Sequence, residues 1–308
     1  MKTEISNSKT LVITAWVALL LGGMPFASLP KIILQEVFDY QFPTNLEYGI
    51  AVAIGILGLG LTFAWNAVRA LRPYFILLLV FAGAAWLVFV RISGLPIYEG
   101  WLANPSPNVA LPAFLSRSLM VSLAMLAALF ILKKKREAFF LVKGDTSAPL
   151  EPVRWLGIKE GATWKKAGWA SVIVLSLGLL TFLIAAGRPS LEIIVRALAF
   201  LPVILLASAM NAFGEEMNSR GSLLSVLADV IGSRQALWLT TAYFGLAHYY
   251  GIPFGVIGVL MAGILGGWLG KSILETRGLG WAWFIHFVQD VCIIAFVVVG
   301  SIAPPGGG

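Results

Sequence analysis

Apolar segments of about twenty residues recur along the chain and limit the folds that it can adopt. A helix of that length crosses the roughly 30 Å hydrocarbon core of a bilayer, and its backbone groups bond to one another. The predicted spans are 11–29, 49–68, 73–90, 113–132, 169–186, 191–212, 236–251, 254–270 and 281–300. The sequence therefore predicts an all-α polytopic membrane protein with about nine transmembrane helices.

The composition supports a membrane protein and argues against a nucleic-acid partner. Of the 308 residues, 59% are hydrophobic and 12% are charged, whereas a soluble domain carries about 25% charged residues. The formal net charge of +7 comes from basic residues clustered between the apolar segments, as the positive-inside rule expects. These clusters predict a cytoplasmic N-terminus. The single cysteine, Cys292, lies in an apolar run, so we expect no disulfide.

Polar segments divide the chain into four parts. Residues 1–132 hold four predicted spans; a signal peptide cleaved near Ala27 is an alternative for the first, but its apolar run is longer than usual for such a peptide. A basic cytoplasmic linker follows at 133–168, broken by prolines. We expect a membrane core over residues 169–300 and a disordered tail over residues 301–308.

Two adjacent carboxylates, Glu215 and Glu216, follow the predicted span 191–212, where we expect the helix to leave the bilayer. Ionisable groups at membrane depth usually face a cavity or a partner, because burying them in lipid is costly. Glu216 and Arg220 are four residues apart and meet on one helical face, whereas Glu215 points about 100° away. One glutamate is therefore expected to face a cavity while the other pairs with Arg220. The alternative is that Glu215 and Glu216 only cap the polar end of the span and have no functional role.

The chain has only two histidines, and both lie downstream in apolar segments. His248 ends the sequence Phe-Gly-Leu-Ala-His, and His286 lies four residues before Asp290. An aspartate beside a histidine can orient the imidazole or join it in binding a metal. Taken alone, His248 could instead be a hydrogen-bonded core histidine. His286 and Asp290, taken alone, could be a polar pair that holds two helices together. Together with the glutamates, these side chains are the usual types for activating water.

Three motifs resemble the CPBP family of intramembrane proteases, which includes the type II CAAX prenyl endopeptidases and bacterial proteins named for abortive infection or bacteriocin immunity. The motifs are Glu-Glu-x-x-x-Arg at 215–220, Phe-x-x-x-His at 244–248 and His-x-x-x-Asp at 286–290. The family often has asparagine where this chain has Asp290. Each motif alone is weak, but all three occur in order in separate segments. The resemblance covers about residues 169–300.

The resemblance implies a C-terminal helical core around an intramembrane cavity that opens towards the cytoplasm. In that core Glu215 would be the general base that activates water, assisted by His248. His286 and Asp290 would stabilise the oxyanion or bind a metal. The remaining motif residues would support the site: Glu216, Arg220 and Phe244.

The family is described both as metalloproteases and as glutamate proteases that need no metal. The expected cofactor is therefore Zn²⁺ or another divalent metal, or none. If a metal is bound, its ligands would be Glu215, His248, His286 and Asp290.

The expected activity is hydrolysis of a peptide bond near the C-terminus of a lipidated or membrane-associated protein or peptide. The expected location is a prokaryotic cell (inner) membrane. A non-catalytic binding, immunity or maturation-partner protein of the same family is the alternative, although the intact Glu215, His248 and His286 argue against it.

A proton-coupled transporter could use such residues as a relay, but the chain has no repeated halves. A His-Glu-x-x-His motif is also absent, which argues against a site-2-type metalloprotease.

Overall fold

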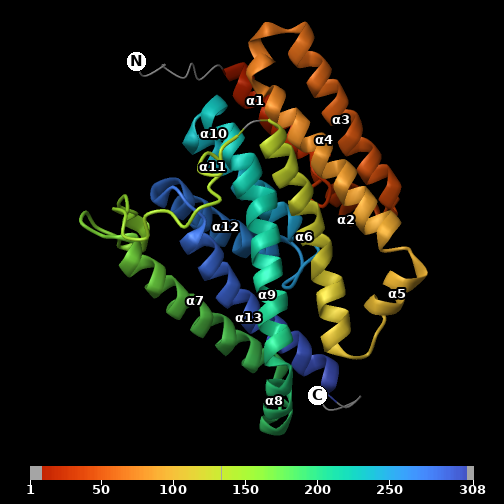
Figure 1. Cartoon of the computed structure of the whole chain (residues 1–308), viewed down its shortest axis with the longest axis vertical. Coiled ribbons are helices and arrows are strands. Elements are labelled where there is room, and N and C mark those ends of the chain that lie inside the picture. Colours follow the sequence, from red (N-terminus) through yellow and green to blue (C-terminus); the bar gives the residue numbers. More distant parts are fainter. Residues whose placement is uncertain (1–8, 133, 304–308) are drawn as a thin grey trace.

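The computed structural model describes residues 9–132 and 134–303, which form helices joined by turns and loops (Figure 1). The N-terminal region contains α1 (Lys9–Ala18), α2 (Leu29–Phe38), α3 (Thr44–Ala64), α4 (Arg72–Trp86), α5 (Pro96–Leu102) and α6 (Pro107–Ile131). The C-terminal region contains α7 (Trp164–Gly187), α8 (Leu191–Ala197), α9 (Leu201–Glu216), α10 (Ser225–Ile231), α11 (Ser233–Ala247), α12 (Val256–Thr276) and α13 (Gly280–Ile302). No strand occurs in the described residues, and the predicted all-α class is confirmed.

Within the described part of the chain, seven helical segments are long and apolar enough to cross a membrane. Even the shortest has 21 residues, which at about 1.5 Å per residue gives roughly 30 Å. The segments are Thr44–Ala64, Asn66–Ile92, Pro107–Ile131, Trp164–Gly187, Leu191–Ile231, Val256–Thr276 and Gly280–Ile302. On α7, Ile173, Val174 and Leu177 are more than half exposed, as expected for a helix that faces lipid. The chain is a multi-pass membrane protein.

The other two predicted spans correspond to shorter helices. α1 and the π-helical turn after it cover only Lys9–Gly23, and Gly22 departs from helical geometry there with φ +102°. α11 has 15 residues and ends before His248, although the predicted span continues to residue 251. A helix of that length reaches about 22 Å, which is less than the bilayer core. The nine predicted spans are thus seven full ones and two short helices.

The helix that carries the two glutamates is longer than the sequence predicts. It runs from Leu191 to Ile231 as one segment of 41 residues, with a π-helical stretch at Met217–Leu224. The predicted span ends at residue 212, but the helix does not end there. Glu215 instead lies near the middle of the segment, and π-helical turns often occur at functional sites.

The helix accommodates three serines in this polar stretch through hydrogen bonds to its own backbone. The hydroxyls of Ser219, Ser222 and Ser225 each donate to the carbonyl four residues earlier, at 2.6, 2.6 and 2.7 Å. These three hydroxyls are therefore satisfied inside the helix and need not reach water.

The N-terminal and C-terminal regions share one core. α9 packs against both α6 and α13, and α11 packs against α12; in Figure 1, α9 runs through the centre with α6 and α13 on either side. One cluster of buried apolar side chains extends from Leu11 in α1 to Ile285 in α13. Between α11 and α12 the approach is close at Gly245, where an added Cβ would lie 2.7 Å from the Val259 carbonyl oxygen. This packing fixes the relative positions of α9, α11 and α13.

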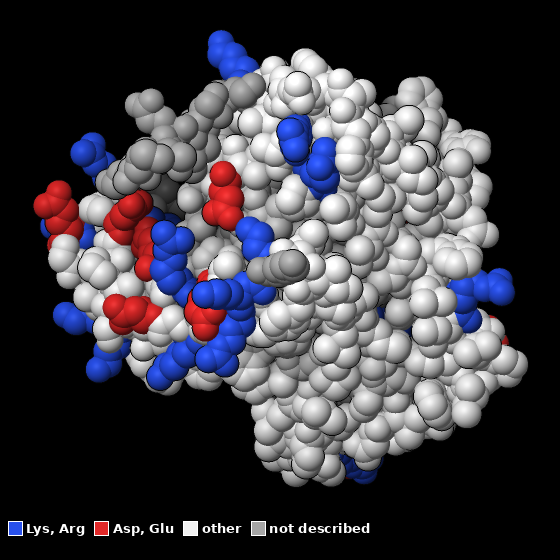
Figure 2. Space-filling model, turned by 45° about the horizontal axis from the view of Figure 1, so that its top comes forward, with Lys and Arg blue, Asp and Glu red and all other residues white. Residues whose placement is uncertain are grey.

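The predicted linker is folded onto the C-terminal helices. Phe139, Phe140 and Leu150 are buried, and Trp164 Nε1 donates to Glu275 Oε2 at 2.7 Å. Figure 2 shows charged side chains gathered on one side of the molecule, while most of the remaining surface in that view is uncharged.

The division into four parts and the cytoplasmic placement of the linker stay predictions. Residues 1–8, Lys133 and residues 304–308 lie outside the described residues, and with them most of the predicted tail. α13 itself extends to Ile302.

Candidate active site

Three helices bring the seven predicted site residues into one cluster. α9 with its π-helical continuation, the end of α11, and α13 each contribute one motif. In that order the residues are Glu215, Glu216 and Arg220; Phe244 and His248; His286 and Asp290. Side-chain contacts within and between these helices, including that of His286 with Glu216, connect all seven residues.

Glu216 and Arg220 form the buried base of the cluster. Their side chains are 0% and 1% exposed, and Arg220 Nη1 lies 2.5 Å from Glu216 Oε1. The same oxygen accepts a hydrogen bond from His286 Nδ1 at 2.8 Å. Arg220 Nε donates to the Gly266 carbonyl at 3.2 Å, and the guanidinium lies 4.3 Å from the centre of the Phe244 ring. Glu216 is therefore the glutamate that pairs with Arg220, and it also orients His286.

Glu215 is the glutamate that faces the two histidines. Its Oε2 lies 3.5 Å from His286 Nε2 and 3.8 Å from His248 Nε2. His248 Nδ1 lies 2.7 Å from the Phe244 carbonyl oxygen, and because a carbonyl only accepts, this Nδ1 carries a hydrogen. His286 Nδ1 donates to the Glu216 carboxylate in the same way. A ring that carries its hydrogen on Nδ1 alone presents the lone pair of Nε2 to Glu215.

Glu215 Oε2 has no hydrogen-bond partner among the residues that the structure describes, although the atom itself is buried. A buried acceptor without a donor costs about 1–3 kcal/mol. A proton, a water molecule or a cation between Oε2 and the two Nε2 atoms would remove that cost. The arrangement therefore suits a site that holds water or a metal.

Asn211 is a site residue that the sequence analysis missed. Its Nδ2 donates to Glu215 Oε1 at 3.2 Å and to Asp290 Oδ2 at 3.1 Å. The other oxygen of Asp290, Oδ1, lies 3.7 Å from His286 Nε2. Asn211 precedes Glu215 by four residues and so lies on the same helical face, which is the signal that could have identified it.

For the peptide hydrolysis that the resemblance implies, replacing Asn211 with alanine should lower kcat/KM by about 10- to 100-fold, the usual effect of losing a group that orients a site residue. The physical reason is that Glu215 and Asp290 lose their shared donor. Asn218→Ala is the matched control, because Asn218 lies in the same helical segment but bonds to Ser118. Cleavage rates per folded protein measure the effect, and equal losses in both variants would contradict the prediction.

The donor types, two imidazoles and two carboxylates, are those that bind a divalent metal. The separations from Glu215 Oε2 to the two Nε2 atoms and from His286 Nε2 to Asp290 Oδ1 are 3.5–3.8 Å. Ligands about 2.0–2.1 Å from a tetrahedral zinc stand roughly 3.4 Å apart. These three separations are roughly 0.1–0.4 Å longer than that. No group of three or more His, Cys, Asp or Glu side chains in the described residues has metal-binding geometry as it stands. Both histidines also have their Nδ1 fixed, as metal-bound histidines do.

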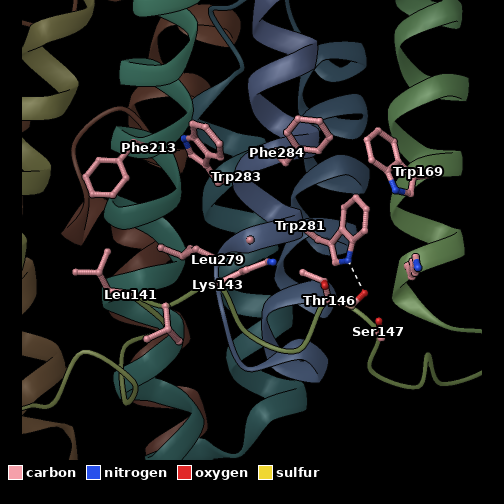
Figure 3. A pocket seen from close by; sticks show the side chains of 13 residues that line it. Leu141, Lys143, Thr146, Ser147, Trp169, Phe213, Leu279, Trp281, Trp283 and Phe284 are labelled. Atoms are coloured by element: carbon pink, nitrogen blue, oxygen red, sulfur yellow. Dashed lines mark hydrogen bonds between the residues drawn. The ribbon is translucent and has the colours of Figure 1, made fainter.

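A pocket of about 710 Å³ lies between α7, α9 and α13 (Figure 3). Its lining includes Phe213 and Trp283, close in sequence to the cluster, but none of the four predicted catalytic residues. In the cluster itself, the Glu215 and His248 side chains are 27% and 36% exposed.

No curated protein and no solved structure matches the chain. Residues 197–292 match the family model of the type II CAAX prenyl endopeptidases, Rce1-like. The match is narrower than the expected 169–300 and covers about a third of the chain. It contains all seven predicted site residues and Asn211. Over residues 197–292 the chain is similar to the Rce1-like type II CAAX prenyl endopeptidases, and the resemblance predicted from the three motifs is confirmed.

Proposed function

We propose that the chain is an intramembrane endopeptidase that hydrolyses a peptide bond near the C-terminus of a lipidated or membrane-associated protein or peptide. One observation carries the proposal: Glu215 Oε2 faces the Nε2 atoms of His248 and His286 and has no donor among the described residues. The family match over residues 197–292 supports it, because that family consists of prenyl endopeptidases.

In the proposed reaction Glu215 is the general base. It takes a proton from a water molecule held between its Oε2 and the two imidazoles, and the resulting hydroxide attacks the carbonyl carbon of the substrate. His286, held at Nδ1 by Glu216, carries a second proton at Nε2 that it takes from solvent before the attack; it donates a hydrogen bond from Nε2 to the oxyanion and keeps this proton throughout. When the C–N bond breaks, Glu215 returns its proton to the amine that leaves. A metal held by Glu215, His248, His286 and Asp290 would supply Lewis-acid activation of the water and the carbonyl.

The charge distribution supports a proposed orientation. Basic residues are concentrated in the linker before α7, and cytoplasmic segments carry the excess of Lys and Arg in multi-pass proteins. We place the linker and the N-terminus in the cytoplasm of a prokaryotic cell and the helices in its (inner) membrane. A cysteine introduced into the linker, at Ser147, should react with a membrane-impermeant maleimide only after the cells are opened. Reaction in intact cells would contradict this orientation.

Cleavage of a peptide panel by the purified protein tests the proposed activity. The panel contains peptides with and without a lipidated cysteine near the C-terminus, and mass spectrometry locates the bond that is cut. Wild type should cut at least one lipidated peptide, and both Glu215→Gln and His248→Ala should lose at least about 100-fold. Wild type that is inert on the whole panel, with correctly folded variants, would favour the binding or immunity function.

A strong chelator in the same assay decides the cofactor. If a metal is part of the site, the chelator should abolish cleavage and added Zn²⁺ should restore it, because Zn²⁺ accepts carboxylate and imidazole ligands. If cleavage continues at the same rate, the side chains activate water without a metal.

A further inference from the structure

The pocket in Figure 3 lies where three segments of the chain meet. The loop 141–147 covers one end, the first turns of α7 form one wall, and the start of α13 forms the floor. Five aromatic side chains line it, and two lysines, a serine and a threonine add polar groups. The aromatic residues are Trp169, Phe213, Trp281, Trp283 and Phe284, and the polar ones include Lys143, Lys165 and Ser147.

The loop that carries Lys143 is held firmly against α13. Trp281 Nε1 donates to the Thr146 carbonyl at 2.9 Å, the dashed line in Figure 3, and Gly280 N donates to the Lys143 carbonyl at 3.2 Å. Gly144 has φ +75°, and an added Cβ there would lie 2.5 Å from the Thr276 carbonyl oxygen. Only glycine fits this position. The backbone at the mouth of the pocket is therefore fixed in place.

The mouth of the pocket is positively charged. Lys143 and Lys165 are exposed, and the residues that line the pocket include no carboxylate. Neither lysine forms an ion pair with another described residue. Two free cations beside an aromatic cleft match a ligand that joins an anion to an apolar chain.

The position of the pocket matches the headgroup level of a bilayer. α7 and α13 both begin beside it, and tryptophans concentrate at the membrane–water interface. Trp169 and Ile173 on α7 are 51% and 55% exposed, so this side of the pocket borders the surface that faces lipid. Lysines at that level attract anionic lipids.

We propose that this pocket binds one membrane phospholipid with an anionic headgroup. The phosphate lies between Lys143 and Lys165, and an acyl chain lies along the aromatic wall formed by Trp169 and Phe284. The site uses none of the residues in the catalytic cluster, so it goes beyond the proposed protease function and does not depend on it.

Native mass spectrometry of the purified full chain, titrated with phosphatidylglycerol or phosphatidylcholine of the same acyl chains, tests this site. Wild type should bind phosphatidylglycerol on the order of tenfold more tightly than phosphatidylcholine, because each lysine adds to the attraction for an anionic lipid. The double variant Lys143→Gln/Lys165→Gln should lose this preference. Lys159→Gln/Lys166→Gln removes two exposed lysines that do not line the pocket, and it should keep the preference.

Two further variants make the test specific. Trp169→Ala should weaken binding of both lipids because the acyl chain loses a wall, and Glu215→Gln should bind as wild type does. If both double-lysine variants lost the preference for phosphatidylglycerol equally, the preference would come from the general charge of the surface. That result would overturn the proposal. Unchanged binding by Trp169→Ala would also overturn it. A lipidated peptide that displaces the phospholipid, with a higher KM in Lys143→Gln/Lys165→Gln, would assign the pocket to the substrate instead.

Discussion

Replacing Glu215 with glutamine should lower kcat/KM for a cleaved peptide by at least about 100-fold, the scale of a lost general base. Glutamine has nearly the same shape, and its carbonyl oxygen can still accept the hydrogen bond that Asn211 Nδ2 gives to Glu215 Oε1. Its amide group, however, cannot take a proton from water. Single-turnover cleavage measures the loss, and thermal unfolding in the same detergent should show an unchanged fold.

Glu192→Gln is the control for this variant. Glu192 is 72% exposed and pairs with Arg196 on α8, earlier in the same helical segment. Its replacement removes the same charge from the same segment but should leave the rate unchanged. A loss below about tenfold in Glu215→Gln would be too small for a general base. That result would assign water activation to other groups of the cluster.

Removing one partner of the Glu216–Arg220 pair should destabilise the protein by about 3–5 kcal/mol, the typical cost of leaving a buried charge without its partner. In Arg220→Met the Glu216 carboxylate, which is 0% exposed, keeps only His286 as a partner. The variant also loses the hydrogen bond to the Gly266 carbonyl and the contact with the Phe244 ring. The unfolding free energy in mixed micelles measures this effect.

The chain contains a matched pair for comparison. Glu192 and Arg196 have the same four-residue spacing and lie 2.6 Å apart, but their side chains are 72% and 64% exposed. Arg196→Met should therefore change stability by no more than about 0.5 kcal/mol. Similar losses in Arg196→Met and Arg220→Met would show that burial does not set the strength of the Glu216–Arg220 pair.

The motif residues could be identified from the sequence because their chemistry is rare in such a chain. Only two histidines are present, and a carboxylate or an imidazole inside a membrane helix needs a partner. The four-residue spacings correctly indicated the pairing of Glu216 with Arg220 and the proximity of His286 to Asp290. Asn211 carries no charge and stands among apolar residues, so the same reasoning passed over it.

The sequence by itself determined the class of this protein, because apolar segments of about twenty residues must become helices in a bilayer. Only the tertiary structure decided where those helices end and which way the site residues point. The segment from Leu191 continues past the glutamates to Ile231, and α11 stops before His248. The physical reason is that a polar residue in a membrane protein can be satisfied by water or by another helix. A local pattern does not distinguish the two, and the contacts of Glu216 with His286 and of Asn211 with Asp290 link residues 70 and 79 positions apart.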